Sequence, residues 1–185
     1  MTLLSHLSSI IPISEALETE LNSLSKELSL SKNEIAIQSG EKCNDLFFVR
    51  KGIMRGYYID EDGKEITNWF AQETEFATCF YAFVAKQPSF EIIQALEDCE
   101  VTRLSNAALQ SLYVKFPETE RIGRIITENY YIRLEERLLN IQFKTAKERY
   151  RNLILSKPGL LQRAPLGQIA TYLGITQETL SRIRA

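Results

Sequence analysis

The chain has 185 residues, enough for one large domain or two small ones, and its 44% hydrophobic content suffices for a buried core and excludes global disorder. The net charge of −2 hides an uneven distribution: residues 1–117 carry 10 Lys/Arg against 17 Asp/Glu, whereas residues 118–185 carry 12 against 7. A basic tail on an acidic body indicates a polyanionic partner for the tail, with a solvated helical surface as the alternative.

No apolar run in the sequence approaches the roughly 20 residues that cross a bilayer, and the N-terminus lacks the pattern of a secretory signal. The three cysteines, Cys43, Cys79 and Cys99, are odd in number and too widely spaced for a disulfide framework or a zinc site. We therefore expect a cytoplasmic protein with no membrane partner, in which these cysteines are buried thiols.

Leucines recur at spacings of three and four through residues 14–30, which predicts a helix there. They are Leu17, Leu21, Leu24 and Leu28. Ser14 stands directly before Glu15 and is a suitable N-cap, because its hydroxyl can accept a hydrogen bond from a free backbone N–H of the first turn.

The pattern changes over residues 34–105, where short runs rich in β-branched and aromatic residues are separated by turn signals. The segments DLFFVRKG and GIMRGYYIDEDGKEITNWF predict strands and a hairpin that closes at Asp62-Gly63. The segment SFEIIQALEDCEVTRLS adds two strands around a turn at Glu97-Asp98. Short strands at even spacing, without helices between them, are typical of a barrel or sandwich.

Helical periodicity returns after residue 105. A short helix, NAALQSLYVKF, ends at Pro117, and residues 118–143 form the longest helical stretch, with Gly123 its weak point. Two apolar rows follow this stretch: Ile122, Ile125/Ile126, Ile132 and Leu139 in one, and Tyr131, Leu134, Leu138 and Ile141 in the other. One row can cover the chain's own core while the other meets a second copy. We favour dimerisation, with burial inside a monomer as the alternative.

Residues 146–156 predict a further helix, ended by Lys157-Pro158-Gly159, and the last twenty residues, LGQIATYLGITQETLSRIRA, have the spacing of helix, tight turn and helix. Gly174 stands where the chain must reverse and tolerates a positive φ. Thr176 can cap the second helix. The apolar positions fit a helix-turn-helix together; they are Ile169, Ala170, Leu173, Ile175, Leu180 and Ile183.

The polar side of the second helix carries residue types that read DNA bases. Glu can accept a hydrogen bond from the cytosine amino group, and Arg can donate two to guanine. The predicted DNA-binding residues are Thr176, Gln177, Glu178, Ser181 and Arg182, with Lys144, Lys147, Arg149, Arg151 and Arg163 as candidate phosphate contacts. For single residues the alternative is a solvated helix surface, since Glu178 and Arg182 could also form an ordinary ion pair.

Two segments of the chain resemble the cyclic-AMP receptor protein/fumarate–nitrate reductase regulator (Crp/Fnr) superfamily. IQSGEKCNDLFFVRKG, at 37–52, is similar to the signature of the cyclic-nucleotide-binding fold in its Gly40-Glu41 pair, the small residue Cys43, the apolar run 46–49 and Gly52. IATYLGITQETLSRI is similar to the recognition motif of the family. Together the two similarities extend over nearly the whole chain.

The resemblance implies an α+β fold in three parts: a cyclic-nucleotide-binding-like β-barrel or jelly-roll sensor at 1–117, a dimerisation helix at 118–143 and a helix-turn-helix DNA-binding domain at 144–185. It implies a homodimer that reads a palindromic operator through residues 177–184, with Gln177, Glu178 and Arg182 contacting bases. The expected partners are double-stranded DNA and a second copy of the chain, with RNA polymerase as a third candidate.

The sequence departs from the family where nucleotide-binding members hold the cyclic phosphate. A Gly-Glu pair and an Arg-Ser/Thr pair ten residues later are replaced here by Thr78-Cys79 and Ser89-Phe90. Because the cation for the phosphate and the carboxylate for the ribose are both missing, we expect that cyclic AMP is not the effector. Aromatic residues crowd this segment, either as barrel core, which we favour, or as the lining of an apolar pocket: Phe76, Phe80, Tyr81 and Phe83.

Other cofactors of the family are not expected either. The iron–sulfur type depends on a cluster of N-terminal cysteines, and residues 1–42 contain none. The haem type needs axial ligands, and the sole histidine, His6, is expected to be a solvated side chain in a mobile terminus. We predict no cofactor, and the effector stays unknown.

The sequence contains no nucleophile–base pair, metal-ligand cluster or Gly-rich phosphate loop, so we do not expect an enzyme. The function that the pattern favours is a DNA-binding transcription regulator. The alternative is a dimeric protein-interaction module that does not bind DNA and keeps a vestigial sensor barrel.

Overall fold

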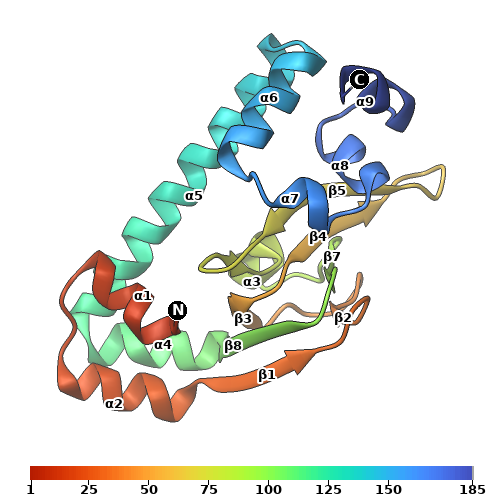
Figure 1. The fold of residues 1–185 in the computed structure, drawn as a ribbon. Coiled ribbons are helices and arrows are strands. Elements are labelled where there is room, and N and C mark those ends of the chain that lie inside the picture. Colours follow the sequence, from red (N-terminus) through yellow and green to blue (C-terminus); the bar gives the residue numbers. More distant parts are fainter. Residues whose placement is uncertain (185) are drawn as a thin grey trace. The chain divides into compact units, whose positions relative to one another are not determined.

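The computed structural model describes residues 1–184, which form helices and strands in the order shown in Figure 1. The strands are β1 Lys26–Leu30, β2 Ile35–Ile37, β3 Asp45–Lys51, β4 Met54–Ile59, β5 Glu65–Ala71, β6 Phe76–Ala77, β7 Ile92–Ala95 and β8 Cys99–Ser105. The helices are α1 Leu3–Ile10, α2 Glu15–Leu24, α3 Phe80–Ala85, α4 Asn106–Lys115, α5 Pro117–Phe143, α6 Ala146–Ser156, α7 Leu160–Arg163, α8 Leu166–Tyr172 and α9 Gln177–Arg184.

The chain divides into two compact units. Unit 1 comprises Met1–Gly56 and Phe70–Ile126, and unit 2 comprises Tyr57–Trp69 and Thr127–Ala185. Unit 1 therefore holds most of the strands together with the first four helices and the start of α5. Unit 2 holds the tip of the β4–β5 hairpin, the rest of α5 and the C-terminal helices. Within residues 1–184, no helix combines the length and apolar character that a membrane span requires.

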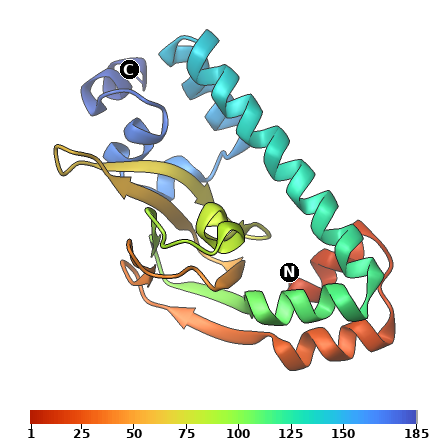
Figure 2. The same ribbon diagram turned by 180° about the vertical axis from the view of Figure 1, so that it is seen from behind.

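The strands form two four-stranded sheets, with the orders β1-β8-β3-β6 and β2-β7-β4-β5. The pairings of β8 with β1 and β3, of β2 with β7 and of β3 with β6 are antiparallel. β1 and β8 lie side by side in both views of the molecule, from the front in Figure 1 and from behind in Figure 2. The predicted α+β fold, with an antiparallel sheet domain, a long helix and C-terminal helices, is confirmed.

The predicted helix at 14–30 is shorter than its leucine spacing suggested. Ser14 caps α2 as expected, since its side chain accepts a hydrogen bond from the N–H of Leu17. The helix ends at Leu24, and Leu28 lies in β1, opposite Val101 of β8. The spacing of Leu28 therefore continues the helical period by coincidence. Pairing with β8 satisfies the backbone of this segment instead, and this long-range contact overrides the local pattern.

The N-terminal segment is not the loose end that the sequence indicated. Residues 3–10 form α1, which buries Leu3 and Leu7 to 6% and 9% exposure. The ring of His6 packs on Phe48 and Phe76, with centroid distances of 5.2 and 5.8 Å. Burial in this aromatic cluster lowers the pKa of His6. The expectation of a solvated His6 in a mobile terminus was wrong, because the contacts that hold the ring come from distant strands.

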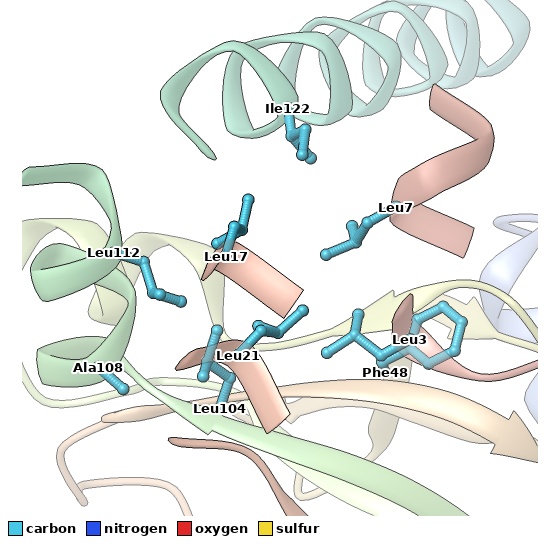
Figure 3. Packing of buried hydrophobic residues seen from close by; sticks show 9 residues of the cluster. All are labelled: Leu3, Leu7, Leu17, Leu21, Phe48, Leu104, Ala108, Leu112 and Ile122. Carbon is cyan, nitrogen blue, oxygen red and sulfur yellow. The ribbon is translucent and has the colours of Figure 1, made fainter. Parts of the chain in front are cut away.

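The helices of unit 1 close one end of its core. Figure 3 shows buried side chains from α1, α2, α4, α5 and the strands β3 and β8 pointing toward one another. They are Leu3, Leu7, Leu17, Leu21, Phe48, Leu104, Ala108, Leu112 and Ile122. Since Ile122 lies near the start of α5, the long helix begins inside this core.

Two turns between strands depend on the residue types at single positions. Gly52, between β3 and β4, has a φ of +98°, and a Cβ atom there would lie 2.5 Å from Sγ of Cys99 and 2.9 Å from the carbonyl oxygen of Asp98. Only glycine fits both the backbone and the space. In the β4–β5 hairpin, the side chain of Asp60 accepts hydrogen bonds from the N–H groups of Asp62 and Lys64, at 3.1 and 2.9 Å. The hairpin thus closes at Asp62-Gly63, as predicted.

The junction of α5 and α6 is fixed by several hydrogen bonds. Thr145 and Glu148 form a capping box. The Glu148 carboxylate accepts hydrogen bonds from the N–H and the hydroxyl of Thr145, both at 2.8 Å, and the Thr145 hydroxyl accepts one from the N–H of Glu148 at 3.3 Å. The guanidinium of Arg149 donates to the carbonyl oxygens of Ile141 and Lys144, at 3.3 and 3.1 Å. The free donors at the start of α6 and free acceptors at the end of α5 are thereby satisfied.

Candidate DNA-binding helix-turn-helix

Helices α8 and α9 are joined by the tight turn that the sequence predicts. Gly174 has a φ of +66°, the left-handed conformation that favours glycine. The N–H of Ile175 donates to the carbonyl oxygen of Ala170 at 3.0 Å, and that of Leu173 to Ile169 at 3.0 Å. These bonds satisfy the last carbonyl groups of α8 and turn the chain toward α9.

The apolar side of α9 is held by neighbouring helices of unit 2. Leu180 has 0% exposure, and α9 packs against both α8 and α6. The other buried apolar residues of this part of the chain, from α6 to the end of α8, are Leu153, Leu160, Ala164, Ile169, Ala170 and Leu173. Full burial of one leucine stabilises the packing by about 1.5–3 kcal/mol, so this contact fixes which side of α9 faces outward.

The first turn of α9 is capped by Thr176, whose hydroxyl accepts a hydrogen bond from the N–H of Thr179 at 3.2 Å. Glu178 lies in the same turn. Hydrogen bonds to its carboxylate, from its own backbone N–H and then from the Thr176 side chain, lower the pKa of Glu178. The carboxylate is therefore charged at neutral pH and placed at the positive end of the helix dipole.

The predicted base-reading residues all lie on the outward side of α9. Thr176, Gln177, Glu178, Ser181 and Arg182 are exposed, in contrast to Leu180. The guanidinium of Arg182 donates to the Thr179 hydroxyl at 3.4 Å, one turn earlier. The arrangement brings a carboxylate, an amide, a hydroxyl and a guanidinium to one edge of one helix, which is the donor and acceptor set that DNA base edges require.

Two residues that position this module were not identified from the sequence. The guanidinium of Arg137, in α5, donates to Oδ1 of Asn68 at 2.7 Å and to the carbonyl oxygen of Tyr172 at 3.4 Å, and it stacks on the Tyr172 ring at 4.7 Å. The hydroxyl of Thr171, in α8, accepts from the N–H of Thr67 at 3.1 Å. The hairpin tip therefore holds α8 within unit 2. No local sequence signal indicates these contacts.

The predicted phosphate contacts differ in availability. Arg149 uses its guanidinium to cap α5, so it positions the helices and is less available to DNA. Lys144, Lys147 and Arg151 are exposed on or beside α6, and Arg163 at the end of α7 is half-buried.

The position that binds the phosphate in nucleotide-binding relatives has an unsuitable donor set here. The Ser89 hydroxyl donates to the carbonyl oxygen of Glu91 at 2.9 Å and accepts from its N–H at 3.0 Å, so it is satisfied internally. Glu91 is buried here, with 5% exposure, and a carboxylate at this place would repel a phosphate. Lys86, at the end of α3, is hydrogen bonded to Asn106. These residues do not fit a cyclic nucleotide.

The aromatic residues of this segment are divided between the core and the surface. Phe83 is 6% exposed and lies in the core, as expected, but Phe80 and Tyr81 are 56% and 58% exposed. The expectation that all four aromatic residues fill the barrel was wrong for these two. Both residues belong to the short helix α3, which was not expected because the surrounding sequence has a strand-like pattern. One face of this helix is exposed.

The fold and the module define a protein with a cyclic nucleotide-binding-type domain and a C-terminal helix-turn-helix. Residues 27–116 match the family model of the cyclic nucleotide-binding domain. The structure of FixK2 from Bradyrhizobium japonicum superposes with a TM-score of 0.72 over 86% of this chain and 82% of that chain, at 23% sequence identity.

Relatives named as regulatory proteins align with most of the chain. An anaerobic regulatory protein of Pasteurella multocida is 26% identical over 173 residues, covering 88% of this chain. A fumarate and nitrate reduction regulatory protein of Vibrio cholerae is 28% identical over 182 residues, covering 90% of this chain and 72% of that protein. The chain thus carries a cyclic nucleotide-binding domain and is similar, along most of its length, to regulators of the Crp/Fnr type, in agreement with the resemblance that its sequence shows. It spans less than two thirds of the Pasteurella protein, of which 63% is aligned.

Proposed function

We propose that this chain is a DNA-binding transcription regulator of the Crp/Fnr type. It acts as a homodimer joined through α5 and reads a palindromic operator with the outward edge of α9. Its functional domains are the sensor at 1–117, the dimerisation helix at 118–143 and the DNA-binding domain at 144–185. The relatives are named as regulatory proteins, which supports a regulator and gives no support to an enzyme.

The observation that carries the proposal is the orientation of α9. Its apolar residue Leu180 is completely buried against neighbouring helices, whereas Gln177, Glu178, Ser181 and Arg182 are exposed together. An amphipathic helix held in this way can enter the major groove, which is wide enough to admit a helix, without unfolding the module that carries it.

The second half of α5 supports a homodimer. Within unit 2, its apolar residues are exposed by 45–74%, although they form continuous rows on the helix: Tyr131, Ile132, Leu134, Leu138, Leu139, Ile141 and Phe143. Rows of this length on one helix are suited to pairing with the same helix of a second copy. Such a dimer presents two recognition helices about 34 Å apart, one turn of DNA.

Further parts of the proposal follow from a regulator of this class. It works in the cytoplasm, where chromosomal DNA is accessible, and RNA polymerase is its third partner. Cyclic AMP is not its effector, because Thr78-Cys79 and Ser89-Phe90 bring no cation to a phosphate. Calorimetry with cyclic AMP should give no saturable heat, and a micromolar dissociation constant would refute this part.

The function is tested by selecting binding sites for the full chain from random DNA duplexes and then titrating salt. A palindromic preference is expected. Affinity should fall by about a thousandfold between about 50 and 200 mM salt if six or more phosphates are contacted, because each contact releases counterions. Absence of duplex binding at low salt would favour a protein-interaction module instead.

Arg182→Ala tests the docking assigned to α9. It should weaken binding to the selected site by about 1–3 kcal/mol and relax the preference at one base position, because a bidentate contact to a base is lost. The matched control is Arg121→Ala, which removes another exposed arginine, from the start of α5 in unit 1. Equal affinity and selectivity of Arg182→Ala and the parent protein would exclude this docking.

A further inference from the structure

Gly167 lies in the first turn of α8, close to the residue that begins α9. A Cβ atom at position 167 would lie 3.0 Å from Oε1 of Gln177. Carbon atoms in contact rest farther apart, at about 3.5–4.0 Å. The side-chain amide of Gln177 therefore lies in the space that the missing side chain of Gly167 leaves free.

The backbone of Gly167 does not require a glycine. Its conformation is that of an ordinary helix, in contrast to the left-handed Gly174. Alanine is the best helix former and glycine one of the poorest, so helix stability alone would favour alanine at this position. The contact with Gln177 is the feature that a methyl group at 167 would change.

The packing of α8 on α9 leaves the two helices little freedom to make room for a methyl group. Ile169 and Ala170 of α8 are each 1% exposed, and Leu180 of α9 is 0% exposed. The Thr176 hydroxyl fixes the first turn of α9 in addition. The group that can move is the Gln177 side chain, which is exposed and leans toward α8, because helical side chains point toward the N-terminus of their helix.

We propose that Gly167 determines base specificity by allowing the Gln177 amide to lie against α8. Glutamine recognises adenine with both ends of its amide, which accepts a hydrogen bond from N6 and donates one to N7. Making both bonds requires the amide to be held within about 0.5 Å and 10–20° of one geometry. A methyl group at 167 would push the amide outward or rotate it, and either change disturbs the two bonds. Gly167 is thus a positioning residue, and the inference rests on the proposed function.

The effect of Gly167 should be confined to one base position in each half-site. Within residues 1–184, and beyond the chain neighbours and helix backbone of Gly167 itself, Gln177 is the only residue that a Cβ atom at 167 would approach within 4 Å. The Arg182 guanidinium lies further along α9 and donates to the Thr179 hydroxyl at 3.4 Å. The contacts of Ser181 and Arg182 with DNA should therefore be preserved.

The experiment selects binding sites from random duplexes for the full chain, for Gly167→Ala, for Gln177→Ala and for the double variant. Gln177→Ala should lower the preference for adenine at one position of each half-site about tenfold or more. Gly167→Ala should lower it at the same position about threefold or more and leave the other positions within about twofold. Adding Gly167→Ala to Gln177→Ala should change nothing further, because both residues act through one contact.

A second readout needs no DNA. In NMR spectra of the free chain, the side-chain amide signal of Gln177 is identified by its loss in Gln177→Ala. Gly167→Ala should shift this signal, whereas the control Arg182→Ala, on the same surface but away from position 167, should leave it in place. The midpoint of thermal unfolding of Gly167→Ala should stay the same or rise by up to about 4 °C, since alanine favours the helix.

Each negative result has a separate meaning. If Gly167→Ala keeps the base preference of the parent chain, or if the Gln177 signal does not move, the inference is overturned. A lower unfolding midpoint with a uniform loss of affinity at all positions would overturn it as well, because Gly167 would then serve only the packing of α8. If the parent chain selects no site, the proposed function fails, and the NMR signal still decides whether Gly167 positions Gln177.

Discussion

The two units treat their apolar side chains in opposite ways. Unit 1 buries its leucines in a core that is closed by α1, α2, α4 and the first turns of α5, where Ile122 is 3% exposed. Unit 2 leaves a comparable set exposed along the same helix, with Leu134 at 60% and Phe143 at 74%. Unit 1 thus closes its core with its own helices, whereas unit 2 presents a surface suited to a second copy.

The largest effect is expected from a substitution that creates a cavity in the core of unit 1. Leu112→Ala should reduce the free energy of unfolding by about 2–5 kcal/mol, because Leu112 is fully buried and the remaining core collapses only in part. Val114→Ala, on the same helix at 87% exposure, is the control and should change stability by less than about 0.5 kcal/mol. Denaturant titration measures both. Similar losses for the two variants would contradict a closed core in unit 1.

A charge on the exposed row of α5 tests the role of unit 2. Ile132→Glu or Leu139→Glu should raise the dissociation constant of the dimer about a hundredfold or more, because two copies of the charge would be buried in the interface. The control is Gln142→Glu, which adds the same charge to the same helix on the line of Glu128 and Glu135, outside both rows. Sedimentation of the three variants gives the answer. If both Ile132→Glu and Leu139→Glu still form dimers, this row of α5 does not lie in the dimer interface.

The anchoring of the helix-turn-helix within unit 2 should be weaker than either core. Arg137→Ala should reduce the stability of unit 2 by about 1.5 kcal/mol, because hydrogen bonds from the guanidinium to Asn68 and Tyr172 are lost together. Arg137→Lys keeps the charge but lacks the planar guanidinium that donates to two acceptors at once, so it should restore only part of the lost stability. Hydrogen exchange of α8 amides measures the effect. Unchanged protection in the alanine variant would exclude an anchoring role.

The smallest effect expected is a pH dependence of unit 1. Burial lowers the pKa of His6 in the folded state, so the unfolded chain binds the proton more readily. The contribution to stability is complete above the unfolded pKa of about 6.5 and is lost as the pH falls through the folded pKa. His6→Phe keeps an aromatic ring on Phe48 and should flatten this part of the curve of Tm against pH. An unchanged curve would assign the dependence to other groups.

The parts of the fold that sequence predicts well are those governed by near neighbours in the chain. The turn at Gly174, the cap at Thr176 and the hairpin at Asp62-Gly63 each depend on residues within one turn, and the structure has all three. The long helix is likewise predicted to within one residue. It was expected at 118–143, and α5 begins one residue earlier, at Pro117. A proline is accepted there because the first helical N–H has no partner within the helix.

Predictions failed where a distant segment decides the environment. Leu28 keeps a helical spacing but pairs with β8, and His6 looks solvated until β3 and β6 bring Phe48 and Phe76 to it. The same applies to Cys43, whose contact with the Thr78 hydroxyl results from the pairing of β3 with β6 and has no local signal. The residues predicted to contact DNA are exposed on one edge of α9, and their roles stay predictions that the duplex experiments address.

The hydrogen bonds between α5 and α6 have a mechanical consequence. The Thr145–Glu148 box fixes the first turn of α6, and the Arg149 guanidinium bonds α6 to the end of α5, so we expect the bend between the two helices to be rigid. In a homodimer joined through α5, a twist of that helix about its own axis would swing α6 by the same angle. Sliding or rolling of the paired helices by a fraction of a turn would then suffice to match or mismatch the two grooves of an operator.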